Sequence, residues 1–326
     1  MSSGWFFNMN SLSARQCTLV SPLEFAGIGV HSGLPVTMSI EPAVAGEGIK
    51  IMRLLDNGKT TGPSEVHYSK ILSTTLCTTL DLGDSKSVAT IEHVVSALSG
   101  LGVDNALIVI NGAECPILDG SAMPFAKAIV QAGLKVLPQK RKYIKILRSV
   151  TVRNNDAFAA LEPYNGRALD LEIDFDSPVI GRQRMIFDWT PKKYFDEVAL
   201  ARTFGFVEEA KILRQGGHAL GSSMENSIAV EKDRVMNPEG LRFDDEFVRH
   251  KLLDAVGDLA LGGLPIYGMF RSFKGGHGLN ALVLSSLFAN DDNYEIVNAD
   301  ELPLVFDALN DLPDGLRVES YLRSVG

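Results

Sequence analysis

The sequence predicts an α+β fold built from two similar two-layer α/β sandwich domains, in which each sheet packs on two helices. Its length of 326 residues fits two domains of ordinary size, each able to bury its own core. In the first half, strand-like stretches lead to a helix, a buried strand and a second helix, and the second half repeats that order. Because a sheet beneath two helices buries one of its faces, both halves fit a two-layer architecture.

The boundary between the domains is expected where the composition becomes basic and contains proline. The stretch LPQKRK at 137–142 is predicted to be the linker. The domains are therefore placed at residues 14–138 and 143–308.

The first half begins with two strand-like stretches, at 35–42 (PVTMSIEP) and 48–53 (GIKIMR). A helix is predicted to open at Thr90. A buried strand at 106–111 and a second helix at about 123–134 follow it.

Thr90 is predicted to be the N-cap of its helix, which places Glu92 and His93 in the first turn. The positive end of the helix dipole favours an ionised carboxylate and a neutral imidazole there. Glu92 would equally serve to stabilise the helix start alone, and the two roles are compatible.

The second half is expected to repeat this order of elements. They are strands near 143–153, 157–162 and 169–175, a helix at 245–261, a strand at 266–273 and a helix from about residue 277. The 245–261 helix, EFVRHKLLDAVGDLALG, is mostly apolar, but His250, Asp254 and Asp258 form a polar stripe along it. Carboxylates on so apolar a helix need partners if they are buried, and a metal ion is one adequate partner.

Two polar clusters far apart in the sequence together offer two imidazoles and a carboxylate, which are enough for a catalytic zinc, although a Glu-His pair alone is usually solvated surface. His250 and Asp254 are four residues apart, so both side chains leave one face of the helix. His93 is a third ligand, and Glu92 beside it is a base for a water in the open fourth position. The alternative for the His/Asp pair is an ordinary hydrogen bond on a helix surface.

Composition excludes several classes of protein. The chain has 31 Lys and Arg against 40 Asp and Glu, a net charge of −9, which argues against a general binder of nucleic acid or of anionic membranes. Its three cysteines are too few and too scattered for a disulfide framework, which fits a reducing compartment. The start, MSSGWFFNMNSLSARQ, does not read as a secretory signal, and no uncharged apolar run reaches the eighteen or so residues that cross a bilayer. We expect a soluble, cytoplasmic protein without stable membrane insertion.

Several long blocks of this sequence resemble the UDP-3-O-acyl-N-acetylglucosamine deacetylase family. They are TIEHVVSALSGLGVDNALIVING, CPILDGSAMPF, RTFGF, EGLRFDDEFVRHKLLDAVGDL and KGGHGLN, in register from about residue 15 to about residue 306. The family contains the zinc amidases of the committed step of lipid A synthesis in Gram-negative bacteria. The resemblance implies two α/β sandwich domains that face each other, with the active site between them.

The resemblance implies hydrolysis of the N-acetyl group of UDP-3-O-acyl-N-acetylglucosamine, which gives UDP-3-O-acyl-glucosamine and acetate. It makes Glu92 the general base and His93 a zinc ligand, alongside His250 and Asp254. Thr203 in RTF resembles the threonine that polarises the scissile carbonyl.

His277 in KGGHG resembles the family's cationic histidine, which stabilises the oxyanion and pairs with the aspartate that matches Asp258. A carboxylate partner would keep the imidazole of His277 protonated by raising its pKa. Whether His277 or Glu92 protonates the departing amine stays open. An isolated histidine after two glycines would more often be a cap or a surface residue.

The resemblance also implies the residues that bind the substrate. Lys251 and Lys274 are expected to meet the sugar nucleotide and a phosphate, although isolated lysines usually face solvent. The apolar-rich insert between Gly205 and Val230 is expected to form a passage for the acyl chain, although its composition also fits a packing element. The expected contacts are Lys251, Lys274, Asp174, Phe175, Phe204, Phe206, Ala219 and Ala229.

Other interpretations remain open at this point. Another zinc amidohydrolase, acting on a different N-acetylated sugar, would share the metal site, and a non-catalytic carrier would keep the fold. Two histidines and an aspartate also accept iron(II) or cobalt(II), although Zn²⁺ is the cofactor that we expect. Cys77 matches a family cysteine near the metal and is either an inert packed thiol or a modulator. The expected partner is the small-molecule substrate alone, with no nucleic acid, and the chain is expected to be a monomer.

Overall fold

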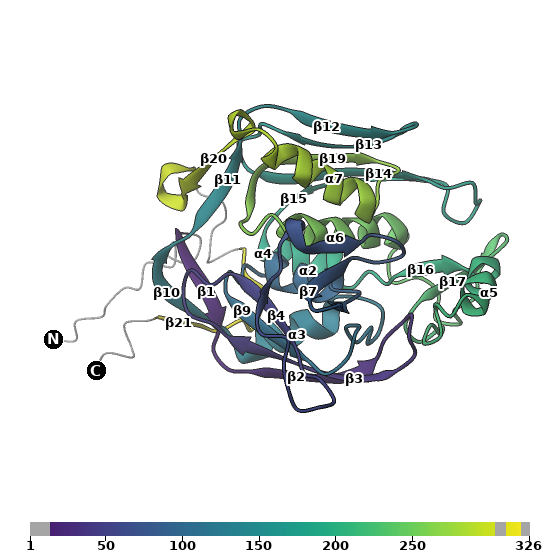
Figure 1. Cartoon of the computed structure of the whole chain (residues 1–326). Helices are drawn as coiled ribbons and strands as arrows, with labels where there is room; N and C mark the ends of the chain where they lie inside the picture. Colours follow the sequence, from purple (N-terminus) through teal and green to yellow (C-terminus); the bar gives the residue numbers. More distant parts are fainter. Residues whose placement is uncertain (1–13, 304–310, 321–326) are drawn as a thin grey trace.

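The computed structural model describes residues 14–303 and 311–320. The first residues of the chain and the predicted end of the second domain at residue 308 lie outside these ranges. Figure 1 shows four layers, a sheet, two layers of helices and a second sheet, with the helices enclosed between the sheets. The predicted α+β fold is confirmed. The two domain boundaries remain predictions.

The sheet of the first half has the strand order β2-β3-β9-β4-β5. Two helices of this half, α2 and α3, cover it on its inner side (Figure 1). Alternate residues of β3 are buried, as expected for a strand with one face on the core. The bounds are β2 Leu23–Ile28, β3 Pro35–Pro42, β4 Ile49–Arg53, β5 Ser64–Glu65, α2 Glu92–Gly100, β9 Ala106–Ile110 and α3 Met123–Ala132.

The second half contains the larger sheet, in which β12, β13, β19, β11 and β20 follow one another and β14 joins β15 to β19. Helices α6 and α7 cover its inner side (Figure 1). The bounds are β11 Lys142–Ile146, β12 Val150–Asn154, β13 Ala157–Glu162, β14 Arg167–Asp174, β15 Arg182–Asp188, α6 Glu246–Ala260, β19 Ile266–Phe273, α7 His277–Phe288 and β20 Tyr294–Asn298.

The two halves share one pattern of strand pairing. In the first half, β9 pairs antiparallel with β3 and parallel with β4. In the second half, β19 pairs antiparallel with β13 and parallel with β14. In both halves the helix that precedes this central strand, α2 or α6, faces the other half. The predicted repeat of element order is therefore matched by a repeat of topology.

Helices α2 and α6 pack directly against each other at the centre of the molecule. Gly257 on α6 makes the approach possible, because a Cβ there would clash with the backbone of Glu92 on α2. Gly100, at the other end of α2, similarly leaves room for the ring of Tyr194. Apolar residues of both helices belong to one core that continues through both halves.

The segment 137–142, predicted to be the linker, is ordered in the structure. Most of it belongs to strand β10 (Leu134–Lys140), which pairs with β1 (Arg15–Leu19) and with β21 (Val318–Ser320). Its basic residues have partners: Arg141 is buried and bonds to both carboxylate oxygens of Asp104, while Lys140 pairs with the exposed Asp300. Long-range strand pairing and a buried ion pair order the segment, and neither is visible in its composition.

The predicted N-cap at Thr90 is also wrong. Helix α2 begins at Glu92, and Ile91 occupies the cap position without a side-chain cap bond. Thr90 has a φ of 57° and donates from its hydroxyl to Glu114 Oε1 at 3.3 Å. Glu92 and His93 nevertheless lie in the first turn, as expected.

Three smaller differences concern strands and one helix end. The strand near 143–153 is two strands, β11 and β12, because the chain turns between residues 146 and 150. Strand β15 was not anticipated, and the second helix of the first half ends at Ala132, after which Gly133 has a φ of 88°.

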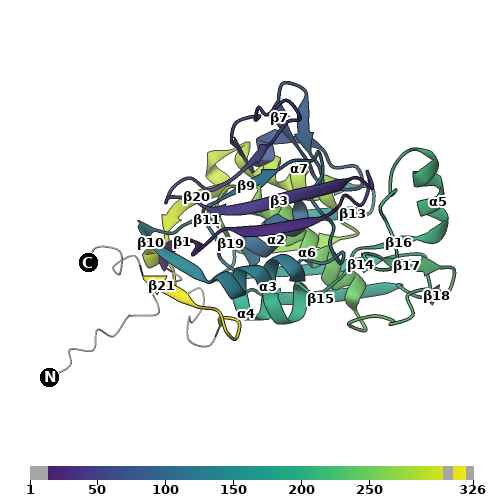
Figure 2. The ribbon, with the colours of Figure 1, turned by 90° about the horizontal axis from the view of Figure 1, so that it is seen from below.

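The insert of the second half forms a small unit of its own. Helix α5 lies beside a three-stranded sheet that projects from the side of the molecule, as Figures 1 and 2 both show. The bounds are β16 Phe204–Phe206, α5 Val207–Gln215, β17 Ile228–Glu231 and β18 Arg234–Val235. The first part of the insert is thus helical.

The remaining elements are short. They are η1 Tyr68–Lys70, β6 Ile71–Ser73, β7 Thr79–Gly83, β8 Lys86–Val88, α4 Pro191–Lys193, η2 Tyr194–Val198, η3 Asp291–Asn293 and η4 Ala299–Glu301. Within the described ranges, no helix has the length and apolar character needed to cross a membrane.

Candidate active site

Helix α6 presents His250 and Asp254 at the centre of the molecule. Both side chains are almost fully buried, with 2% and 3% of their residues' surface exposed. They lie one turn apart on the same helix face, and His250 Nε2 is 3.3 Å from Asp254 Oδ1. The predicted i, i+4 pair is therefore an interior pair and not a surface hydrogen bond.

Helix α2 contributes His93 from the other half of the protein. His93 Nε2 lies 3.8 Å from Asp254 Oδ1, and one ligand atom from each of His93, His250 and Asp254 falls within 4.8 Å of the others. Ligand atoms at tetrahedral angles around zinc, with bonds near 2.1 Å, would be separated by about 3.4 Å. Three such atoms at these spacings, two nitrogens and one oxygen, fit a zinc-type site.

The protonation states of these three side chains favour the binding of a metal cation. Burial, together with the neighbouring His250, lowers the pKa of His93 to about 3, and burial also lowers the pKa of His250. Burial alone would raise the pKa of Asp254, but His250 and Lys251 outweigh it and hold that pKa below its usual range. At neutral pH the site thus offers two neutral imidazoles and one carboxylate, the forms in which these side chains bind metals.

A hydrogen bond to the backbone fixes the orientation of the His250 ring. Its Nδ1 lies 3.1 Å from the carbonyl oxygen of Ala201, so Nδ1 carries the hydrogen and Nε2 keeps its lone pair toward Asp254. Asp254 is held as well, because Lys251 Nζ donates to its Oδ2 at 2.8 Å. One oxygen of Asp254 is thereby oriented and the other faces the histidines.

A second group of side chains lies beside the three ligands. His277 Nδ1 donates to Asp258 Oδ2 at 2.8 Å, and His277 Nε2 is 3.9 Å from Glu92 Oε1. Burial would lower the pKa of His277, but the charge of Asp258 and its hydrogen bond outweigh burial and raise that pKa to about 10. His277 is therefore a cation at neutral pH.

Glu92 lies between this cation and the ligand cluster. Desolvation is the largest influence on it and, opposed by the charge of His277, raises its pKa to about 7. A carboxyl group with a pKa near neutrality both accepts and returns a proton under physiological conditions.

Two residues that sequence reasoning missed complete the support of Asp258. The Thr78 hydroxyl donates to Asp258 Oδ1 at 2.6 Å, and Asn280 Nδ2 donates to Asp258 Oδ2 at 2.9 Å. The backbone N–H of Thr78 also donates to Glu92 Oε2 at 3.1 Å. The only signal in the sequence was the position of Thr78 next to Cys77 in STTLCTTL, which carries no information about its partners.

A cavity of ≈410 Å³ extends from Glu92 and His93 into the insert. Most of its wall is apolar and comes from β16, α5 and the segment before β17. Besides Glu92, five of the predicted substrate or catalytic residues line it: Thr203, Phe204, Phe206, Ala219 and Ala229. The structure therefore brings the predicted acyl-binding residues to the same cavity as the predicted base, Glu92, and one predicted metal ligand, His93.

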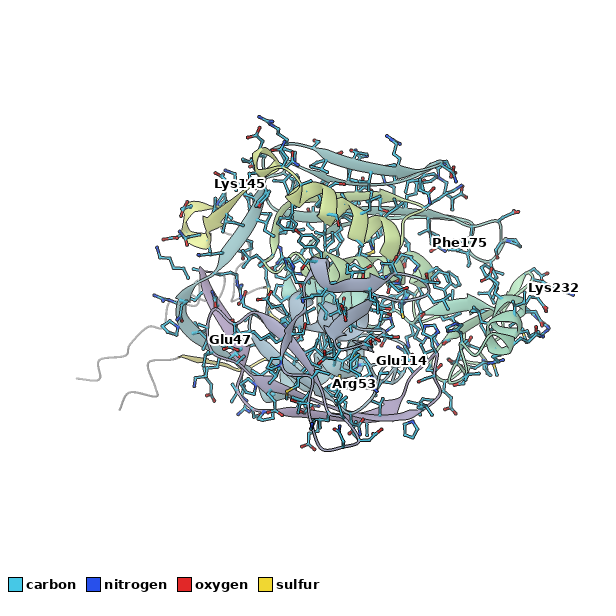
Figure 3. The ribbon with its side chains drawn as sticks, in the orientation of Figure 1. Glu47, Arg53, Glu114, Lys145, Phe175 and Lys232 are labelled. Atoms are coloured by element: carbon cyan, nitrogen blue, oxygen red, sulfur yellow. The ribbon has the colours of Figure 1, made fainter. Side chains whose placement is uncertain are left out.

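Phe175 joins this aromatic wall, with its ring centroid 5.6 Å from that of Phe204 and 6.2 Å from that of Phe206. Figure 3 labels Phe175 on the side of the larger sheet that faces the insert. Its neighbour Asp174 is exposed and pairs with Lys274 at 3.1 Å.

The two predicted substrate lysines lie in different surroundings. Lys251 is one-quarter exposed, pairs with Asp254 and lies over the ring of Phe204. Lys274 is partly exposed and pairs with two exposed carboxylates, those of Asp156 and Asp174.

Cys77 is buried beside the catalytic group, and burial raises the pKa of its thiol to about 11. A thiol with that pKa is neither a strong nucleophile nor a ready metal ligand at neutral pH. This favours the inert, packed interpretation of Cys77.

Comparison with known proteins gives one consistent family. Residues 16–289 match a family model described as UDP-3-O-acyl N-acetylglycosamine deacetylase. A UDP-3-O-acyl-N-acetylglucosamine deacetylase of Pseudoalteromonas atlantica is 41% identical over 297 residues, which cover 90% of this chain and 97% of the relative. Proteins of the same name from Nitratiruptor sp. (41% over 285 residues, 87% and 94% covered) and Brucella ovis (40% over 289 residues, 88% and 100% covered) are similar.

Proposed function

The chain belongs to the UDP-3-O-acyl-N-acetylglucosamine deacetylase family, and from that premise we propose that its buried His93, His250 and Asp254 hold the metal ion of the deacetylase. The enzyme hydrolyses the N-acetyl amide of UDP-3-O-acyl-N-acetylglucosamine in lipid A biosynthesis. The observation that carries the proposal is the convergence of these ligands from α2 and α6 with Glu92 and His277 beside them.

Zinc is the metal that we propose. The donor set of two imidazole nitrogens and one carboxylate oxygen leaves the fourth position of a tetrahedral ion open, as catalytic zinc sites do. Bound there, the ion would supply a Lewis acid that acidifies water and polarises a carbonyl oxygen.

Glu92 is proposed as the general base. Its Oε2 is occupied by the backbone N–H of Thr78, so Oε1 is the oxygen that is free to accept a proton from the attacking water. With a pKa near 7, the carboxylate form is populated at neutral pH.

When water attacks the amide carbon, the carbonyl oxygen becomes an oxyanion, which positive charge and hydrogen-bond donors stabilise. His277 offers an imidazolium whose Nε2–H points toward the Glu92 side of the site, and the hydroxyl of Thr203 lines the same cavity as Glu92. Expulsion of the amine requires a proton, which His277 or the protonated Glu92 delivers. His277 Nε2 and Glu92 Oε1 are 3.9 Å apart, so either group could reach the same leaving nitrogen.

Substrate binding is proposed to divide between the apolar cavity and the charged rim. Each methylene of an acyl chain buried in the cavity contributes about 0.8 kcal/mol. Lys274, at the rim, is proposed to meet a phosphate of the nucleotide and Lys251 the sugar, with Asp174 and Phe175 nearby.

The surroundings in which the enzyme works are proposed from its chemistry. Three buried cysteines, free of disulfides in the structure, fit the reducing cytoplasm, where a nucleotide sugar is available. The site is built from one chain, so a monomer would suffice.

The decisive experiment is acetate release from UDP-3-O-acyl-N-acetylglucosamine by the purified protein, before and after chelation and after zinc is restored. We expect activity that is lost on chelation and recovered with zinc. His250→Ala should abolish activity and lower the bound zinc per protein, whereas Glu92→Gln should abolish activity and retain the zinc. A folded, metal-loaded sample that releases no acetate at any acyl length would point instead to another N-acetylated sugar as substrate.

A further inference from the structure

Two segments from different halves of the protein meet beside the acyl cavity, residues 29–33 and residues 219–221; we call this contact the seam. The backbone N–H of Leu220 donates to His31 O at 3.0 Å, and that of Gly221 donates to Val30 O at 3.0 Å. Val30, His31 and Ala219 line the cavity that also contains Glu92 and His93. The seam is therefore part of the cavity wall.

The two segments of the seam approach at backbone distance. A Cβ on Gly221 would clash with the carbonyl oxygen of Gly29, and one on Gly33 would lie 3.2 Å from Leu220 Cβ. Gly33 also has a φ of 66°, which favours glycine. Contact this close depends on the exact position of the 29–33 loop.

Glu114 holds that loop. Its Oε1 accepts the backbone N–H of His31 at 2.8 Å, and its Oε2 accepts that of Ser32 at 2.9 Å. The carboxylate of Glu114 is buried, with 6% of the residue exposed. It lies so close to Gly29 that a Cβ on residue 29 would clash with it. Figure 3 shows Glu114 on the side of the body from which the insert projects.

The same carboxylate also reaches the start of the catalytic helix. The hydroxyl of Thr90 donates to Glu114 Oε1, and Thr90 comes two residues before Glu92. The chain around Glu114 forms a parallel bridge with Ala89. Glu114 thus lies between the base of the reaction and the wall of the acyl cavity.

We propose that Glu114 is a positioning residue for acyl-chain recognition: it fixes the 29–33 loop so that the seam closes the wall of the acyl cavity. The inference rests on the proposed function, because it concerns the chain that this cavity would receive. Glutamine has the shape of glutamate but a single acceptor oxygen, so Glu114→Gln leaves one N–H of the loop facing an NH₂ group.

The test compares two substrates, UDP-N-acetylglucosamine with a long and with a short 3-O-acyl chain. For Glu114→Gln we expect KM to rise about tenfold with the long chain, the effect of leaving one buried donor unpaired. The kcat with both substrates and the KM with the short chain should stay near wild type. Glu24→Gln, at an exposed glutamate of the same half, is the matched control and should change nothing.

A second variant changes the seam on the side of the insert. Gly221→Ala pushes the segments apart without touching Glu114, and it should raise the long-chain KM in the same selective way. Because both substitutions open one contact, the double variant should lose less than the product of the two single effects. Gly221→Ala also decides the matter if Glu114→Gln does not fold.

The possible outcomes distinguish a failure of this proposal from a failure of the proposed function. An equal loss of kcat with both substrates would show that Glu114 acts on α2 through Thr90 and would overturn the proposal, as would unchanged KM values in both variants. A wild-type enzyme that deacetylates neither substrate would refute the proposed function itself. Wild-type activity without any chain-length effect in the variants would refute the seam alone.

Discussion

Thr78 orients two carboxylates at once, through its hydroxyl to Asp258 and its backbone N–H to Glu92. Thr78→Val removes only the hydroxyl and keeps the shape and the backbone bond. We expect kcat to fall about tenfold, the effect of one hydrogen bond to a charged group, with KM unchanged. Thr78→Ser, which restores the hydroxyl, should recover most of the activity, and a serine variant as slow as the valine variant would contradict this assignment.

Asp258 sets the charge of His277, and this predicts a pH effect. The protonated imidazole is the proposed active form, so activity is present below the pKa of His277 and is lost as the pH rises through it. Asp258 raises that pKa to about 10. Asp258→Asn removes the charge, lowers the pKa and should move the alkaline limb of the pH–kcat profile to lower pH.

The control for this pH profile is Asp300→Asn. Asp300 is exposed and pairs with Lys140, at the end of strand β10. Its alkaline limb should coincide with that of wild type. An unmoved alkaline limb in Asp258→Asn would show that another group controls it.

Single residues also show what the sequence could and could not predict. His250 and Asp254 were found because their spacing and their apolar helix are visible in the sequence. Thr78, Glu114 and Asn280 were not, since each acts through a partner brought near only by folding, as Thr78 and Asp258 are across 180 positions.

Helices α2 and α6 meet through Gly257, and this close crossing sets the distance between Glu92 and the proposed metal ligands on α6. Gly257→Ala should separate the helices and lower kcat at least about tenfold, because small displacements of reacting groups cost large factors in rate. Gly100→Ala, which instead meets Tyr194 at the remote end of α2, should destabilise the fold but spare more of the activity. Wild-type kcat in Gly257→Ala would show that the crossing tolerates a methyl group.

At the level of elements, periodic patterns predicted well and local signals predicted poorly. Helix α6 and strands β3 and β13 lie where the spacing of apolar residues places them. The N-cap at Thr90 failed because its hydroxyl bonds to Glu114, which is remote in sequence. The strand at 134–140 could not be predicted because it depends on pairing with the distant residues 15–19.

The joint between the two halves is a stability element of the whole molecule. Arg141 is buried and its guanidinium bonds to Asp104 and to the carbonyl of Gly102. Asp104→Ala leaves this charge without its carboxylate and should lower the free energy of unfolding by about 3 kcal/mol. Asp300→Ala, which breaks the exposed pair with Lys140 nearby, should change it by less than about 1 kcal/mol.

Urea unfolding of both variants measures this difference directly. Equal destabilisation by the two substitutions would mean that burial of the Arg141 pair adds nothing to stability.

The shared topology of the two halves has a consequence for which residues the site can hold. Helices α2 and α6 occupy equivalent places in the two repeats and face each other, as they would across the twofold axis of a homodimer. In a symmetric dimer, both copies of that helix must carry the same residues, so an ion on the axis would see pairs of identical ligands. Two halves of one chain are free of that constraint, and here α2 carries Glu92 and His93 while α6 carries His250 and Asp254. Two halves of one chain can therefore bring different side chains to a shared site, whereas a site on the axis of a homodimer is restricted to pairs of identical ones.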